Sequence, residues 1–154
     1  MTCFVFSSPP VANAYTDLVR FGCVFGSHAL LVVRDPDIDP GSSIANILVA
    51  LLPFIENSAR AEEWPGTRLF GHAAMLHRYR TSPEFADALL TLRPSLLSWL
   101  HPDAPEDLCF LRIDGRPLLV TVSHESDAYM LLDREEVSEI QNRYPTLAAA
   151  IRPE

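Results

Sequence analysis

The side chains best suited to chemistry in this sequence are one histidine and two carboxylates near its C-terminal end. Between Pro105 and Leu132, three short apolar runs are separated by turn residues, a pattern that predicts an antiparallel three-stranded meander. Because side chains alternate from face to face along a strand, Asp107, His124 and Asp127 should converge at one end of one face. Neighbouring carboxylates stabilise an imidazolium ion, so such a histidine could serve as a general acid or base.

Two interpretations of this polar group remain open. In the first, His124 is a catalytic base that Asp107 or Asp127 orients. In the second, the group has a purely structural role at a sheet end, because ion-pair networks also form where no chemistry occurs. Ser123 is not expected to pair with His124, since adjacent strand residues face opposite ways. Cys109 is expected as a core residue, too far along its strand for a thiol–imidazole pair.

The elements that must position this group are helices and strands of ordinary length. Helices are predicted at 11–21, from Ser43 with a break at Pro53, from Ser82 with a break at Pro94, and from Asp133, with a last helical turn at 147–151. Strands are predicted at 23–33, where the sequence is almost continuously apolar, and at 69–79, where it alternates. Residues 62–67 are expected to form an irregular turn.

Exposed carboxylates and one tryptophan form a second set of candidate residues, here for binding a partner. They are Asp35, Asp37, Asp39, Glu62, Glu63, Trp64, Glu106 and Glu125. The three aspartates alternate as at the start of a calcium loop, but Pro40 stands where that loop needs glycine and Asn46 where it needs glutamate. We therefore expect a solvated acidic loop and no metal site.

Composition narrows the function further. The chain has 154 residues, a net charge of −8, twelve arginines and no lysine, which excludes a Walker phosphate loop and lysine Schiff-base chemistry. Its three cysteines do not form a disulfide framework or a zinc motif. No signal peptide or membrane span is expected, so the predicted location is the cytoplasm. An acidic surface repels nucleic acid and suits a basic protein partner.

Three motifs together resemble those of a known family. They are Trp64-Pro65-Gly66-Thr67, then Pro105 to Phe110 (PEDLCF), and His124-Glu125 with Asp127-Ala128. A family of small bacterial cytoplasmic proteins carries similar motifs, and some of its members are labelled stage III sporulation proteins. The resemblance covers about the last two-thirds of the chain and implies a shared fold, but it implies no activity.

The sequence predicts a single globular α+β domain over residues 1–154. We expect one mixed, mainly antiparallel sheet of about five strands with helices packed on it. No cofactor is expected. The function predicted first is that of an acidic inhibitor of the immunity or antitoxin kind, which binds a basic toxin; a small hydrolase using His124 and a regulatory or scaffold protein are the alternatives. The oligomeric state is left open.

Overall fold

An eight-stranded antiparallel sheet runs through the computed structural model, which describes residues 1–154. The strand order is β10-β1-β9-β8-β7-β2-β6-β3, and every neighbouring pair is antiparallel. The strands are β1 (Thr2–Phe6), β2 (His28–Val33), β3 (Ile55–Ala61), β6 (Ala74–Arg80), β7 (Glu106–Leu111), β8 (Pro117–Val122), β9 (Asp127–Leu132) and β10 (Ile151–Pro153). A separate two-stranded hairpin consists of β4 (Glu63–Trp64) and β5 (Thr67–Arg68).

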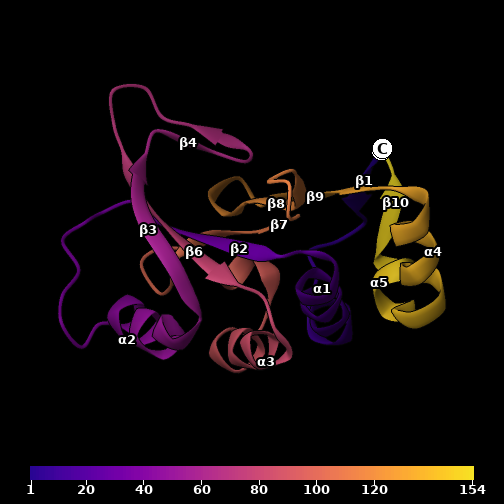
Figure 1. Ribbon diagram of the computed structural model, residues 1–154, viewed down its shortest axis with the longest axis horizontal. Helices are drawn as coiled ribbons and strands as arrows, with labels where there is room; N and C mark the ends of the chain where they lie inside the picture. The colour runs from indigo at the N-terminus through magenta and orange to yellow at the C-terminus, as the bar shows by residue number, and fades with distance from the viewer.

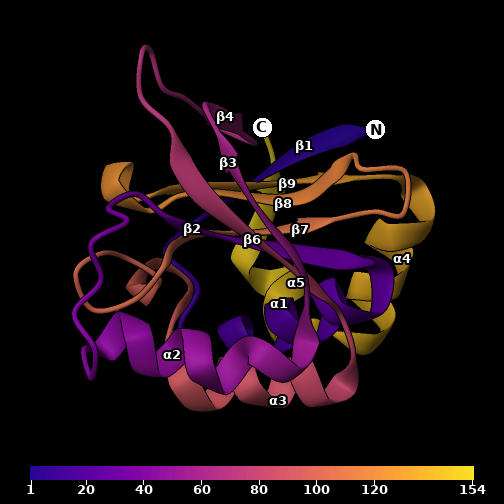
Figure 2. The same cartoon turned by 60° about the vertical axis from the view of Figure 1, so that its left-hand side comes forward.

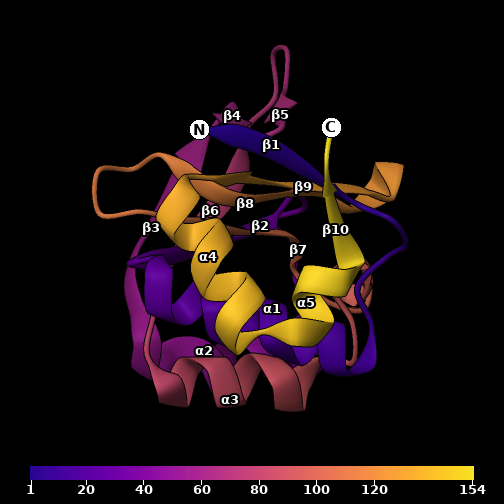
Figure 3. The same ribbon diagram turned by 90° about the vertical axis from the view of Figure 1, so that its right-hand side faces the viewer.

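All the α-helices cover one face of the sheet, and the β4–β5 hairpin lies over the other (Figure 1). The helices are α1 (Ala12–Phe25), α2 (Ser43–Leu51), α3 (Pro83–Leu92), α4 (Arg134–Arg143) and α5 (Pro145–Ala150), with short 3-10 turns η1 (Leu52–Phe54), η2 (Leu96–Ser98) and η3 (Ser123–Glu125). None of the helices is both long and apolar enough to cross a membrane. Strands β1 and β10 run side by side, so the two ends of the chain lie close together (Figure 3).

The main core of 25 buried residues lies between the sheet and the helices. Burial of this much apolar surface is the dominant stabilising term in a domain of this size. Within it, Trp99 Nε1 donates a hydrogen bond of 2.9 Å to the Tyr15 hydroxyl, so both polar groups are satisfied. A second buried polar contact joins Arg112, after β7, to Glu136 in the first turn of α4 through three hydrogen bonds to the Glu136 Oε atoms.

The predicted C-terminal meander is present as β7, β8 and β9. Phe110 pairs with Leu119, as a two-residue turn at Asp114-Gly115 requires, although a bulge then places Leu111 opposite Pro117. The second connection is longer than expected. Val122 lies opposite Asp127, and residues 123–126 form η3 and a left-handed turn at Ser126. Each residue of the meander therefore keeps its predicted face of the sheet at both turns. At the second turn the register differs from the predicted one by an even number of residues, and at the first turn the bulge absorbs the difference.

The α+β class and the largely antiparallel sheet are confirmed, but the prediction of about five strands in a mixed sheet was wrong. Strands β1, β3 and β10 were not predicted. β3 reads IENSARA and is exposed along most of its length. It is an edge strand with little apolar alternation, which is the signal that identifies a half-buried strand. Strand β10 has only three residues and needs β1 beside it.

Three predicted elements had wrong boundaries. The strand expected at 23–33 begins only at His28, because Cys23 to Phe25 end helix α1; a short apolar run does not distinguish a buried helix from a buried strand. The strand expected at 69–79 starts at Ala74. The helix from Ser43 ends at Leu51, and Ile55, assigned to its apolar stripe, starts β3 instead.

The remaining helix predictions match more closely. Ser42 and Ser82 cap α2 and α3 through their hydroxyls, and Asp133 with Glu136 forms the reciprocal capping box of α4. The irregular turn expected at 62–67 is in fact the β4–β5 hairpin, with Pro65-Gly66 at its turn.

Candidate functional site

A β-bulge at the start of β7 sets the geometry of the candidate site. Leu30 pairs with Cys109 and Val32 with Glu106, so Asp107 and Leu108 together lie opposite the single residue Leu31. Asp107 is the residue that absorbs this extra length, with a left-handed φ of 57°. Aspartate tolerates this conformation better than most residues because its short side chain can form local hydrogen bonds.

Asp107 is fully buried, and both of its carboxylate oxygens accept hydrogen bonds. Trp64 Nε1 donates to Oδ2 at 2.9 Å, and the backbone N–H of Ser123 donates to Oδ1 at 2.8 Å. These two donors come from the β4–β5 hairpin and from the turn after β8. A single carboxylate therefore joins three segments that are distant in the sequence, and it does so with charge-assisted hydrogen bonds.

The hairpin reaches Asp107 because its turn packs closely on the sheet. Gly66 has a φ of +84°, and a Cβ atom at this position would lie 2.8 Å from methyl carbons of both Val120 and Val122. Only glycine combines this conformation with so close an approach. The turn is thereby held against β8, and Trp64, immediately before it, is 6% exposed.

The guanidinium group of Arg34, which follows β2, contacts all the other polar members of the site. Its Nε lies 3.0 Å from Glu106 Oε1, and its Nη2 lies 3.6 Å from Asp107 Oδ2. The same Nη2 lies 3.3 Å from His124 Nδ1. The guanidinium carbon stands 5.2 Å from the centre of the Trp64 ring, a cation–π distance. We call these five residues, Arg34, Trp64, Glu106, Asp107 and His124, the Arg34 cluster.

The electrostatics of the cluster are those of two adjacent carboxylates that share one cation. Burial raises the pKa of Glu106, although the positive charge of Arg34 opposes that shift. Without Arg34, two buried negative charges would stand side by side, which is very costly in a region of low dielectric constant. A positive charge at the position of Arg34 is therefore needed to keep both carboxylates buried in the folded state.

One oxygen each of Glu106 and Asp107 and one nitrogen of His124 lie within 4.8 Å of one another, as ligands of a metal ion would. However, the Arg34 guanidinium contacts all three of these residues. It already supplies the positive charge that the carboxylates require, so the donor set does not call for a metal ion.

His124 lies on η3, outside the regular strand on which it was expected, and its side chain is 43% exposed. Its Nδ1 faces the Arg34 donor, so this nitrogen acts as the acceptor, and its Nε2 lies 3.7 Å from Glu125 Oε1. The oxygens of Asp107 are occupied by Trp64, Ser123 and Arg34. The cluster therefore brings His124 and Asp107 together, but Asp107 does not contact the imidazole as its partner, and Arg34 occupies the accepting nitrogen of the ring.

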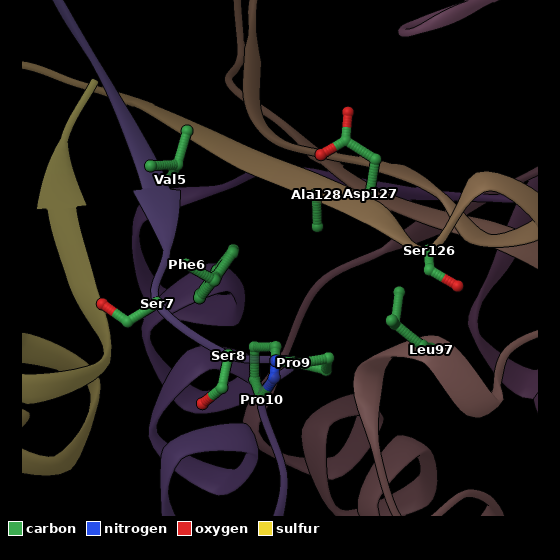
Figure 4. Close-up of a pocket in the computed structure, with 10 residues that line it drawn as sticks. All are labelled: Val5, Phe6, Ser7, Ser8, Pro9, Pro10, Leu97, Ser126, Asp127 and Ala128. Atoms are coloured by element: carbon green, nitrogen blue, oxygen red, sulfur yellow. The ribbon is translucent and has the colours of Figure 1, made fainter.

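Asp127 does not join this group. It is exposed at the start of β9, opposite Val122, and lines a small cavity of about 180 Å³ between the end of β1 and η2. In Figure 4 its carboxylate points away from Leu97 and from the two prolines of that cavity. The predicted convergence of Asp107, His124 and Asp127 is thus only partly present.

The exposed acidic candidates lie next to the Arg34 cluster along the chain. Asp35, Asp37 and Asp39 follow Arg34 directly, Glu62 and Glu63 precede Trp64, and Glu125 follows His124; all six are exposed, whereas Glu106 is buried within the cluster. The loop after β2 and the turn η3 lie at the same end of the sheet, on the left in Figure 2. The three segments that carry most of the predicted partner-binding residues thus each contribute a residue to the Arg34 cluster.

Arg34 was missed by the sequence analysis, and so was its link to Trp64. The only signal was an arginine directly after a buried apolar strand, where an acidic loop follows. The bulge that turns Glu106 and Asp107 toward Arg34 cannot be recognised from the alternation of apolar residues in β7.

The chain matches no protein-family model, no curated protein and no solved structure. Its resemblance to a small bacterial family with similar motifs stays a prediction.

Proposed function

We propose that the protein is a non-catalytic binding protein of the immunity or antitoxin kind, which neutralises a basic bacterial toxin in the cytoplasm by direct contact. The observation that carries this proposal is the set of exposed carboxylates on the three segments that meet at the Arg34 cluster. Six acidic side chains are exposed on these segments, and each segment also supplies a residue of the cluster.

The charge of the surface indicates the chemistry of the partner. The whole chain carries a net charge of −8, and the exposed carboxylates add to it locally at this end of the sheet. Complementary charge accelerates association and rejects partners of like charge. A basic protein surface fits these requirements, and the phosphate backbone of a nucleic acid does not.

The hydrolase alternative receives less support from the geometry. His124 Nδ1 accepts from Arg34, and no nucleophile with a free approach stands beside the ring: Ser123 is buried, and its backbone N–H is directed to Asp107. A general base needs a nitrogen that is free to take a proton and a group that orients it. His124 lacks the first of these, because its accepting nitrogen, Nδ1, is already occupied by Arg34.

The experiment that tests the proposal is capture of the partner from the native host, followed by measurement of its affinity for variants. Asp35, Asp37 and Asp39 are all changed to Asn, which preserves shape and removes three negative charges. The control changes Glu84 and Glu135 to Gln and Asp87 to Asn, which gives the same net charge but on the helical layer.

The proposal predicts that the loop variant binds the captured partner at least tenfold more weakly and with a smaller dependence on salt, whereas the control binds as the wild type does. Equal losses in the two variants would show that only overall charge matters. No loss in the loop variant would remove this surface from the interface.

A further inference from the structure

The Arg34 guanidinium fits its surroundings only in part. Its Nε is buried 3.0 Å from Glu106 Oε1 but forms no well-directed hydrogen bond, and its Nη2 stays 3.6 Å from Asp107 Oδ2. Carboxylates bind guanidinium groups best through paired, parallel N–H bonds. Two carboxylates and a tryptophan face are therefore arranged around an arginine that does not form this paired geometry with them.

The groups around Arg34 are more firmly fixed than Arg34 itself. Trp64, Glu106 and Asp107 are all at least nine-tenths buried and are joined by the Trp64–Asp107 hydrogen bond. The Arg34 side chain is 31% exposed and begins the exposed loop that ends at α2. The arginine thus has a path to solvent, whereas the side chains that bind it are buried.

We propose that Trp64, Glu106 and Asp107 form a guanidinium-binding site, which Arg34 occupies in the free protein and which an arginine of the basic partner takes over on binding. The site itself needs no partner, but the exchange rests on the proposed function. One cation enters as another leaves, so the two buried carboxylates are never left uncompensated. The released Arg34 remains beside the exposed Asp35 and Asp37.

This exchange would select arginine over lysine. A planar guanidinium can contact two carboxylates at once and stack on an indole ring, whereas an ammonium group is a compact, strongly hydrated point charge. The inference therefore specifies the partner more closely than charge alone does: it presents an arginine, free to extend into the site, within its basic surface.

The first test is chemical rescue of the site without any partner. Arg34→Ala removes the occupant, and Arg34→Lys serves in its place if the alanine variant does not fold. Melting temperatures are measured in methylguanidinium chloride and in methylammonium chloride at equal concentrations, with Arg152→Ala, an exposed arginine outside the cluster, as the control.

We expect methylguanidinium to raise the melting temperature of Arg34→Ala by about 2–4 °C over methylammonium, because a ligand that binds only the folded state stabilises it. The wild type and Arg152→Ala should show no such difference, and Arg34→Ala with Glu106→Gln should lose it. Equal effects of the two salts on Arg34→Ala would overturn the site.

The second test follows the exchange in the wild-type protein by NMR of the Arg34 Nε–H group. A tri-arginine peptide should shift this signal toward the position of free arginine, and a tri-lysine peptide should not. The same response to both peptides, or to neither, would overturn the exchange. Because neither test uses the natural partner, a failed capture would count against the proposed function alone, and a failed rescue against the site alone.

Discussion

Replacement of Asp107 by Asn isolates the charge that holds the candidate site together. Asparagine has nearly the same size and also tolerates a left-handed φ, so the backbone at the bulge should be unaffected. Its amide offers one oxygen where the carboxylate offers two, so either Trp64 Nε1 or the Ser123 N–H would face an NH₂ group. Arg34 would also lose one of its two counter-charges.

The expected cost follows from these contacts. A hydrogen bond to a charged group contributes about 1.5–3 kcal/mol, and removing one partner of a buried ion pair costs about 3–5 kcal/mol. Because the Arg34–Asp107 contact is long and Arg34 keeps Glu106, we expect a loss of about 2–4 kcal/mol in the free energy of unfolding, which is less than the sum of those two ranges.

Urea unfolding followed by circular dichroism and tryptophan fluorescence measures this loss, with the exposed Asp127→Asn as the control. The control should remain within about 0.5 kcal/mol of the wild type, as surface changes usually do. If Asp107→Asn also remained within that range, the account of the Arg34 cluster as a tightly coupled centre would be refuted.

Three further predictions address the groups around this centre. Gly66→Ala should destabilise the fold by about 1–2 kcal/mol from its left-handed φ and by a further ~1–3 kcal/mol from overpacking against Val120 and Val122. Gly71 has a φ of +75° and open space around it, so Gly71→Ala should show only the first of these costs in urea unfolding. Arg112→Ala should cost about 3–5 kcal/mol because it leaves the buried Glu136 unpaired, and the exposed Arg116→Ala should change the unfolding free energy by less than about 1 kcal/mol. Because burial raises the pKa of Glu106 above 4.5, the folded state binds more protons there than the unfolded state, and this residue lowers stability as pH rises above that value. The stability of Glu106→Gln relative to the wild type should therefore increase from pH 4.5 toward neutrality, and a flat difference in thermal unfolding across this range would contradict that pKa shift.

The parts of the fold that the sequence predicted are those in which local chemistry and tertiary packing agree. The caps at Ser82 and Asp133 are local hydrogen bonds, and each of these helices begins where its cap predicts. The β7–β8–β9 meander joins neighbouring segments through short turns, so its pairing follows from alternation and turn residues alone. These features require no knowledge of distant parts of the chain.

The missed elements depend on partners that are far away in the sequence. β10 is a strand only because β1 lies beside it, and β3 has no apolar face of its own to reveal it. Cys23 to Phe25 form the last turn of α1, although their apolar composition suits a strand equally well.

The candidate site was predicted only in part for the same reason. His124 and Asp107 do lie near each other, because the turn that carries His124 directly follows β8, which pairs with β7. Arg34 and Trp64 reach them from β2 and from the hairpin, over separations of 90 and 43 residues for the two contacts concerned. The bulge at Asp107 further redirects its side chain in a way that strict alternation does not allow.

The central claim is that the acidic surface around the Arg34 cluster binds a basic protein. Its most direct measurement is the dissociation constant of the captured partner at low and physiological salt, for the wild type and for the variant in which Asp35, Asp37 and Asp39 are all Asn. The account predicts at least a tenfold weaker complex at low salt and a smaller change with salt for the variant. Identical dissociation constants at both salt concentrations would contradict it.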